Sequence, residues 1–175
     1  ADAEKAWGLR WAGLRYFNVA GAGWDDLGDM ATLNLIPMVL DRLSKGETPK
    51  IFGTDYPTPD GTCVRDYIHV KDLAGAHIAA LDYLAGGQDM AEHIFNVGTG
   101  QGASVREVVS KVIASTGLDL EPEELARRAG DPPQLIGNAT RIGEVLGWKA
   151  EHDLDDIVTS SYTSWQADPN RPHFG

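Results

Sequence analysis

The chain has 175 residues, of which 42% are hydrophobic and 23% are charged, an ordinary composition for one globular domain or an incomplete two-domain protein. Its formal net charge of −11 argues against a nucleic-acid-binding or membrane-surface protein, since both need a basic patch. The single cysteine, Cys63, excludes an internal disulfide, and no apolar run approaches the roughly 20 residues of a membrane span. We therefore expect a soluble, cytoplasmic protein without nucleic-acid or membrane partners.

The first third of the chain alternates helix and strand patterns. The expected elements are the end of a helix over 3–11, closed near Gly8 or Gly13, a buried strand over 14–19, a loop over 21–29, an amphipathic helix over 33–43, a short strand over 50–53 and a turn over 54–61. Pro37 is tolerable in this helix only if it lies in the first turn.

The stretch from Gly61 to Leu73 changes its period midway. Apolar residues alternate over 64–70, which predicts a strand whose other face carries Arg65, Tyr67 and His69. From Leu73 the apolar period is helical. A face with a cation, a phenol and an imidazole suits an anionic, hydroxyl-rich ligand, and a half-exposed strand whose polar side chains face water is an equal alternative.

The second half continues the alternation. The expected elements are a buried strand over 93–97, a helix that begins at Ser104, a segment over 118–125 that fits either a strand or a helix, a short helix over 139–146 capped by Asn138, and a last helix capped by Asp153. Strands that alternate with helices in this way predict an α/β fold.

A glycine-rich turn over 98–103 satisfies the looser form of the dinucleotide-binding fingerprint, and Asp119 follows at roughly the right distance. In such sites a phosphate binds the amides of a helix N-terminus. Here Ser104 already caps the following helix with its own hydroxyl. A plain strand-to-helix turn or a loop on the sugar side is therefore the favoured interpretation.

Other chemical patterns are weaker. Tyr67 and Lys71 have the spacing of a Tyr-x-x-x-Lys pair, but one lies on a strand and the other at a helix start, so we interpret the spacing as a coincidence. His69 and His77 lack partners at ligand spacing, and we predict no metal site. His77 falls on an apolar helical stripe and is expected in the core, and Cys63 is expected to be structural.

Two arginines, Arg127 and Arg128, precede a Gly-Asp turn. Such arginines could clamp a phosphate while Asp131 accepts a hydrogen bond from a sugar hydroxyl. Taken alone, the segment is better interpreted as an ordinary solvated loop.

Taken together, these segments resemble the C-terminal half of the UDP-glucose (galactose) 4-epimerases, a family of the extended short-chain dehydrogenase/reductases. The resemblance covers essentially the whole chain. It is carried by Leu14–Ala22, Asn34–Pro37, Ile51–Gly61, Gly61–Leu73, Phe95–Gly98 and Arg128–Pro132, and 52–70 is its most specific part.

The resemblance implies a role for each matching position. The roles fall into a substrate set and a cofactor set. The substrate set is Arg65 and Arg128 at the UDP pyrophosphate, Asp131 at the ribose hydroxyls, Phe52 at the uracil, Asn18, Asn34 and Leu35 at the diphosphate and nucleotide, Val105 in the same pocket, and Leu135 beside the sugar. The cofactor set is Tyr16 and Phe17, near the nicotinamide of NAD.

The resemblance also implies a domain arrangement. Residues 1–24 and 71–100 would be the remaining elements of the NAD-binding Rossmann domain, and 25–70 and 101–175 the UDP-sugar domain. The family's glycine-rich NAD loop and its Ser/Tyr/Lys catalytic set have no counterpart in this sequence. We therefore expect no catalytic residue here, an inactive isolated chain, and the N-terminal half of the same enzyme as a partner.

In the family, the sugar is oxidised at C4 by hydride transfer to NAD, rotates as a 4-keto sugar and takes the hydride back on its other face. UDP-glucose and UDP-galactose are the implied substrates, and a homodimer formed through helices of the N-terminal half is the implied assembly. The alternatives are another nucleotide-sugar dehydratase or decarboxylase, and a non-catalytic UDP-binding module.

Overall fold

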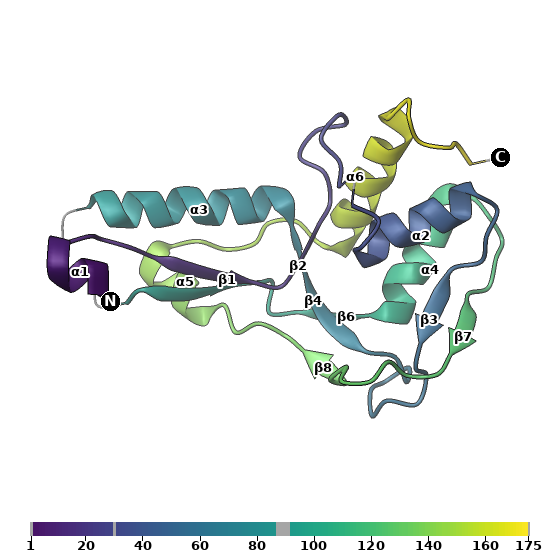
Figure 1. Cartoon of the computed structure of the whole chain (residues 1–175), viewed down its shortest axis with the longest axis horizontal. Coiled ribbons are helices and arrows are strands. Elements are labelled where there is room, and N and C mark those ends of the chain that lie inside the picture. The colour runs from purple at the N-terminus through teal and green to yellow at the C-terminus, as the bar shows by residue number, and fades with distance from the viewer. Residues whose placement is uncertain (1, 30, 87–91, 175) are drawn as a thin grey trace.

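The structure is a computed structural model that describes residues 2–29, 31–86 and 92–174. Figure 1 shows an elongated molecule, with the N-terminus at one end and three packed helices near the other. The elements in chain order are α1 (Asp2–Trp7), β1 (Gly13–Tyr16), β2 (Asn18–Ala20), α2 (Leu35–Ser44), β3 (Lys50–Phe52), β4 (Val64–His69), α3 (Val70–Ala85), β5 (Ile94–Val97), β6 (Gly102–Ser104), α4 (Val105–Thr116), β7 (Glu123–Leu125), β8 (Gln134–Leu135), α5 (Thr140–Leu146) and α6 (Leu154–Ala167).

The strands of the described residues form three small sheets. β1 pairs with β5 and β3 pairs with β7, both in parallel. In the central sheet β4 pairs in parallel with β2 and β8 and antiparallel with β6. Together with the helices these sheets confirm the predicted α/β fold, in which β4 runs through the middle of the molecule (Figure 1).

Two hydrophobic clusters lie against β4. One gathers buried side chains of α2, α4 and α6 around Ile51 and Tyr67, and the other surrounds Ile68 and Phe95. Because successive side chains of a strand point to opposite faces, adjacent residues of β4 serve different clusters. The strand therefore joins the two ends of the molecule.

Several helices have the ends that the sequence predicts. Ser104 accepts a hydrogen bond from the Glu107 amide at the start of α4, and Asp153 forms a capping box with Asp156 at the start of α6. Pro37 lies in the first turn of α2. None of the helices in the described ranges is long and apolar enough to cross a membrane.

Some expected elements have different bounds. The strand expected over 14–19 is two short strands, β1 and β2, which separate at Phe17 and enter different sheets. The ambiguous segment over 118–125 contributes β7, while β6 and β8 were not expected. β6 is the segment Gly-Ala-Ser and β8 has only two residues, so neither carries the apolar alternation that predicts a strand.

The helix expected from Leu73 begins at Val70, because the His69 side chain accepts a hydrogen bond from the Lys71 amide and caps it. The expectation that His77 lies in the core is wrong. Its side chain is exposed, since the buried face of α3 is formed by Asp72, Ala76 and Ala80. Cys63 is buried.

Candidate functional site

A pocket of about 320 Å³ lies between the start of α2, β3, β4 and the segment that follows β7. Seven of the nine substrate-binding residues expected from the sequence line it: Asn18, Leu35, Phe52, Arg65, Val105, Arg128 and Asp131. Residues from six separate parts of the chain thus meet in one cavity. Lys50, Arg42 and Met38 complete much of the remaining wall.

Arg65 is the anchored cation of this pocket. Its Nη1 atom donates to the carbonyl oxygens of Val64 and Pro132, each at 2.9 Å, and its Nη2 atom lies 3.5 Å from a carboxylate oxygen of Asp131. The strand pairing of β4 with β8 brings the 131–135 segment to this position. These contacts hold one face of the guanidinium and fix the direction in which it can meet an anion.

Arg128 is held differently. Its guanidinium carbon lies 3.8 Å from the ring centroid of Phe52, a cation–π stack between two residues that line the pocket. The neighbouring Arg127 turns away from this pocket. It stacks 4.1 Å from the centroid of Tyr56 and pairs with Asp55 at 2.5 Å, so the two expected arginines separate into one that lines the pocket and one that braces a turn.

Tyr67 and Cys63 also line the pocket. Tyr67 belongs to the strand face that was expected to suit an anionic ligand, whereas Cys63 was not expected there. Burial raises the pKa of the Tyr67 phenol to about 12, although a hydrogen bond with Asn18 and the nearby Arg65 act in the opposite direction. Tyr67 therefore stays a neutral hydrogen-bonding group. Arg65 and Tyr67 line the same pocket, as strand alternation predicted for two residues of one face.

A second pocket, of about 390 Å³, adjoins the first. The expected cofactor residues Tyr16 and Phe17 line it together with Asn34, while Asn18, Leu35 and Tyr67 line both pockets. The Asn34 amide donates to a carboxylate oxygen of Asp29 at 2.7 Å. Two cavities that share a wall fit a ligand that extends from one into the other.

Leu135 lines neither of these two pockets. It pairs with Arg65 across the β4–β8 ladder, and its side chain is 50% exposed. The structure thus places Leu135 one strand away from Arg65, on the surface of the described residues.

The turn over 98–103 does not present its amides to a ligand. The Thr99 and Gly100 amides donate to the Asp66 carboxylate at 2.9 and 3.1 Å, and the Ser104 side chain caps α4. A phosphate would need the same amides. The dinucleotide interpretation of this turn is therefore contradicted. Residues 98–101 connect β5 to β6, which leads directly into α4, so the turn is not a plain strand-to-helix turn.

A larger cavity, of about 630 Å³, lies beside this turn. Its wall carries four carboxylates, Glu107, Glu144, Glu151 and Asp153, and one lysine, Lys149. Such a wall repels an anion, whereas the 320 Å³ pocket carries three arginines and one lysine beside the single carboxylate of Asp131. Size alone would select the larger cavity, but charge selects the smaller one for a phosphate ligand.

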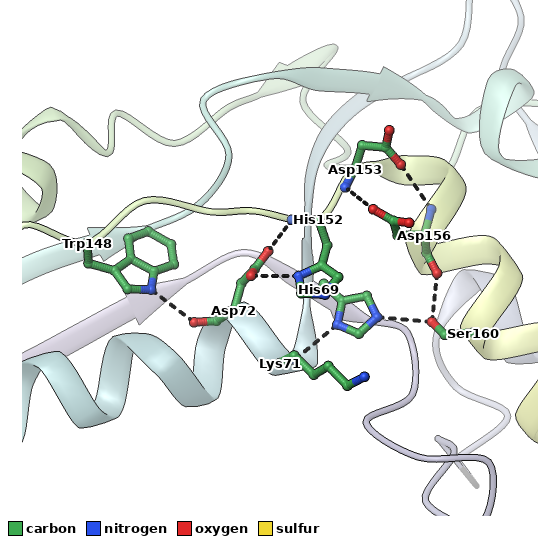
Figure 2. A network of polar contacts seen from close by, with 8 residues as sticks. All are labelled: His69, Lys71, Asp72, Trp148, His152, Asp153, Asp156 and Ser160. Carbon is green, nitrogen blue, oxygen red and sulfur yellow. Dashed lines mark hydrogen bonds and ion pairs between the residues drawn. The ribbon is translucent and has the colours of Figure 1, made fainter.

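His69, the third polar residue of the expected strand face, has a structural task instead. Its Nε2 atom lies 3.0 Å from the Ser160 hydroxyl, and its ring stacks on that of His152 with centroids 4.4 Å apart. Figure 2 shows both rings beside Asp72, which binds the His152 amide and ring. The network joins the starts of α3 and α6, so the expected ligand-facing trio is reduced to Arg65 and Tyr67.

The described part of the chain holds no candidate metal site, since no three His, Cys, Asp or Glu side chains there are grouped so that they could bind an ion.

Comparison with known proteins identifies relatives. Residues 1–98 match the NAD dependent epimerase/dehydratase family. The chain is 48% identical over 169 residues to a UDP-glucose 4-epimerase of Azospirillum brasilense, an alignment that covers 94% of this chain and 48% of that protein.

Solved structures of the same family resemble this chain as well. The UDP-glucose 4-epimerase from Brucella ovis in complex with NAD superimposes with a TM-score of 0.83 and 41% identity, over 91% of this chain and 50% of that one. The enzyme from Bifidobacterium longum in complex with NAD+ and UDP gives 0.82 and 37%, over 97% and 51%. The chain thus spans about half the length of these relatives, and it belongs to the NAD dependent epimerase/dehydratase family.

Proposed function

We propose that this chain is the UDP-sugar-binding half of an NAD-dependent UDP-glucose/UDP-galactose 4-epimerase. The observation that carries the proposal is the convergence of Arg65, Arg128, Phe52 and Asp131 in one pocket. Two guanidinium groups suit a diphosphate, an aromatic ring suits a base, and a carboxylate suits ribose hydroxyls. The chain's similarity to an epimerase solved with UDP supports the same ligand.

In the proposed mechanism the chain binds and orients the substrate. Arg65 and Arg128 hold the diphosphate, and Asn18 and Leu35, which line both pockets, guide the sugar toward Tyr16 and Phe17. Binding energy gained at UDP then restricts the position of the hexose without a direct contribution to the chemical step. The proton transfers at the sugar belong to the catalytic set of the other half.

NAD is the cofactor of the proposed reaction, in which it supplies hydride acceptance and return at C4. The residues of this chain would contribute only a minor part of the binding of NAD. Tyr16 and Phe17 line the second pocket, whereas the amides of Thr99 and Gly100 are already bonded to Asp66. We therefore propose that the other half binds most of the cofactor.

We further propose the domain division 1–24 with 71–100 and 25–70 with 101–175, the first belonging to the NAD-binding domain. The parallel pair β1–β5 beside α3 supports this division. The N-terminal half of the same enzyme, and a second copy of the whole enzyme, are the proposed partners. The buried, single thiol of Cys63 is compatible with the proposed cytoplasmic location.

The test uses the protein at its natural length, with UDP binding measured by calorimetry and UDP-glucose turnover measured by product analysis. The proposal expects UDP to bind and UDP-galactose to form with no change in mass, and it expects no turnover by the isolated chain. Loss of water from UDP-glucose would instead indicate a dehydratase, and loss of carbon dioxide from UDP-glucuronate, assayed beside it, would indicate a decarboxylase. UDP binding without any product would indicate a binding module.

A further inference from the structure

Asp66 is a fully buried carboxylate that the proposed mechanism does not use. It follows Arg65 on β4 and therefore points to the opposite face of the strand. One oxygen accepts from the Thr99 amide at 2.9 Å and the Thr99 hydroxyl at 2.8 Å, and the other accepts from the amides of Gly100 and Gly137, both at 3.1 Å. One side chain thus ties two distant segments to the strand.

The chemistry of these contacts requires a carboxylate. All four partners are donors, and an ionised carboxylate is an acceptor at both oxygens. An asparagine in the same place would turn an NH2 group toward two of the four donors. It would leave either Thr99 or the pair Gly100 and Gly137 without a buried acceptor.

The two segments form the support of Phe17. A Cβ atom on Gly137 would overlap the Phe17 ring, and one on Gly98 would come within 3.2 Å of it and 2.6 Å of an Asp66 oxygen. The ring therefore lies directly against backbone that Asp66 holds. Leu135, two residues before Gly137, pairs with Arg65 across the β4–β8 ladder.

We infer that Asp66 is a positioning residue, which fixes Phe17 relative to Arg65 and so sets the nicotinamide end of the site. The inference rests on the proposed function. It separates the two ends of that site, because the described donors to Asp66 are Thr99, Gly100 and Gly137, and none belongs to the diphosphate and uracil end. Loss of Asp66 should disturb sugar turnover and spare UDP binding.

The test compares Asp66→Asn with Asp72→Asn in the protein at its natural length. Asp72 is the matched control, since it is also a buried carboxylate, and it binds the His152 amide at 3.0 Å away from both pockets. Three quantities are measured: amide exchange at Thr99, Gly100 and Gly137, the fluorine NMR signal of labelled Phe17, and kcat for UDP-glucose beside the Kd for UDP.

In Asp66→Asn we expect exchange at these amides to quicken by about tenfold or more, the Phe17 signal to move, and kcat to fall by about tenfold or more while the Kd for UDP stays within about twofold. Asp72→Asn should change none of them. The inference would be overturned by an unmoved Phe17 signal, by an unchanged kcat, or by a loss of UDP affinity parallel to the loss of kcat. It would also be overturned if kcat fell equally in both variants.

Gly137→Ala serves if Asp66→Asn does not fold. It moves the Phe17 ring directly and keeps the amide that Asp66 binds, so kcat should fall with the Kd for UDP preserved. Unchanged turnover would overturn the inference. Absence of UDP binding in the unmodified protein would refute the proposed function instead, and the exchange and fluorine measurements would still decide the role of Asp66.

Discussion

The guanidinium carbon of Arg128 lies 3.8 Å from the ring centroid of Phe52, so a cation covers the aromatic face that the proposed function assigns to uracil. A base that stacks on this same face of the ring has to displace the guanidinium. The displaced group is then free to meet the diphosphate, which carries the opposite charge. The stack therefore links recognition of the base to recognition of the phosphates.

Arg128→Ala is predicted to weaken UDP binding by about tenfold or more, because a charge-assisted hydrogen bond contributes about 1.5–3 kcal/mol. Arg127→Ala is the matched control, since Arg127 braces Asp55 and Tyr56 and does not line the pocket. Calorimetric titration with UDP measures both. A similar loss of affinity in the two variants would contradict the assignment of Arg128 to the diphosphate.

The convergence of Arg65, Phe52 and Arg128 was expected from the resemblance to the 4-epimerases, whereas strand alternation alone indicated only that Arg65 and Tyr67 share a face. The role of Asp66 could not be expected from either. Its partners lie 33 to 71 residues further along the chain, and no local pattern records such distances. His77 was wrongly expected in the core, because an apolar stripe on a helix does not show which edge of the stripe is covered by the rest of the protein.

Asp131 is predicted to accept a hydrogen bond from the ribose. The protein should therefore bind UDP more tightly than 2′,3′-dideoxy-UDP by about tenfold, and Asp131→Asn should reduce this ratio by about half or more. Competition titrations with both ligands give the ratio directly, which cancels any change in overall affinity caused by release of Arg65. An unchanged ratio in the variant would remove the ribose from the role of Asp131.

His69 predicts a pH-dependent stability. Burial lowers its pKa, and the nearby His152 and Lys71 lower it further, whereas Asp72 and Asp156 raise it. Because the folded-state pKa lies below the ordinary value of about 6.5, the unfolded chain takes up a proton first as the pH falls. The contribution of neutral, buried His69 to the free energy of unfolding is thus present above about pH 6.5, and it is lost as the pH falls through the folded-state pKa.

Urea unfolding between about pH 5 and pH 8 measures this effect. His69→Asn keeps a side chain that can cap α3 but removes the titration, so its free energy of unfolding should fall less steeply below about pH 6.5 than that of the unmodified protein. His77→Asn changes an exposed histidine and should follow the unmodified curve. Parallel curves for all three proteins would exclude His69 as the titrating group.

Gly61 closes the turn that leads into β4. Its φ is +80°, and a Cβ atom there would overlap the Thr54 carbonyl oxygen. Gly46 has a similar φ of +70° with nothing within 4 Å of the added atom. Gly46→Ala should therefore destabilise the protein by about 1–2 kcal/mol, the cost of the left-handed backbone alone, and Gly61→Ala by about 3 kcal/mol or more. Chemical denaturation compares the two, and equal values would show that the turn can open to admit a methyl group.

One exposed, apolar face of α3 is where we expect the missing half to pack. Ile78 and Leu81 are 61% and 64% exposed there, while the opposite face packs on the second hydrophobic cluster through Ala76. The chain spans about half the length of its relatives, and we propose that α3 belongs to the NAD-binding domain, so the other half should cover this face.

Ile78→Lys is then predicted to lower the free energy of unfolding of the natural-length protein by about 2 kcal/mol or more, since a charge would replace a buried aliphatic group. Leu27→Lys is the control, because Leu27 is equally exposed, at 61%, in the segment between β2 and α2. If the two substitutions proved equally harmless in denaturant titrations, the face of α3 would be free in the natural-length protein, and the proposed packing of the two halves would have to be abandoned.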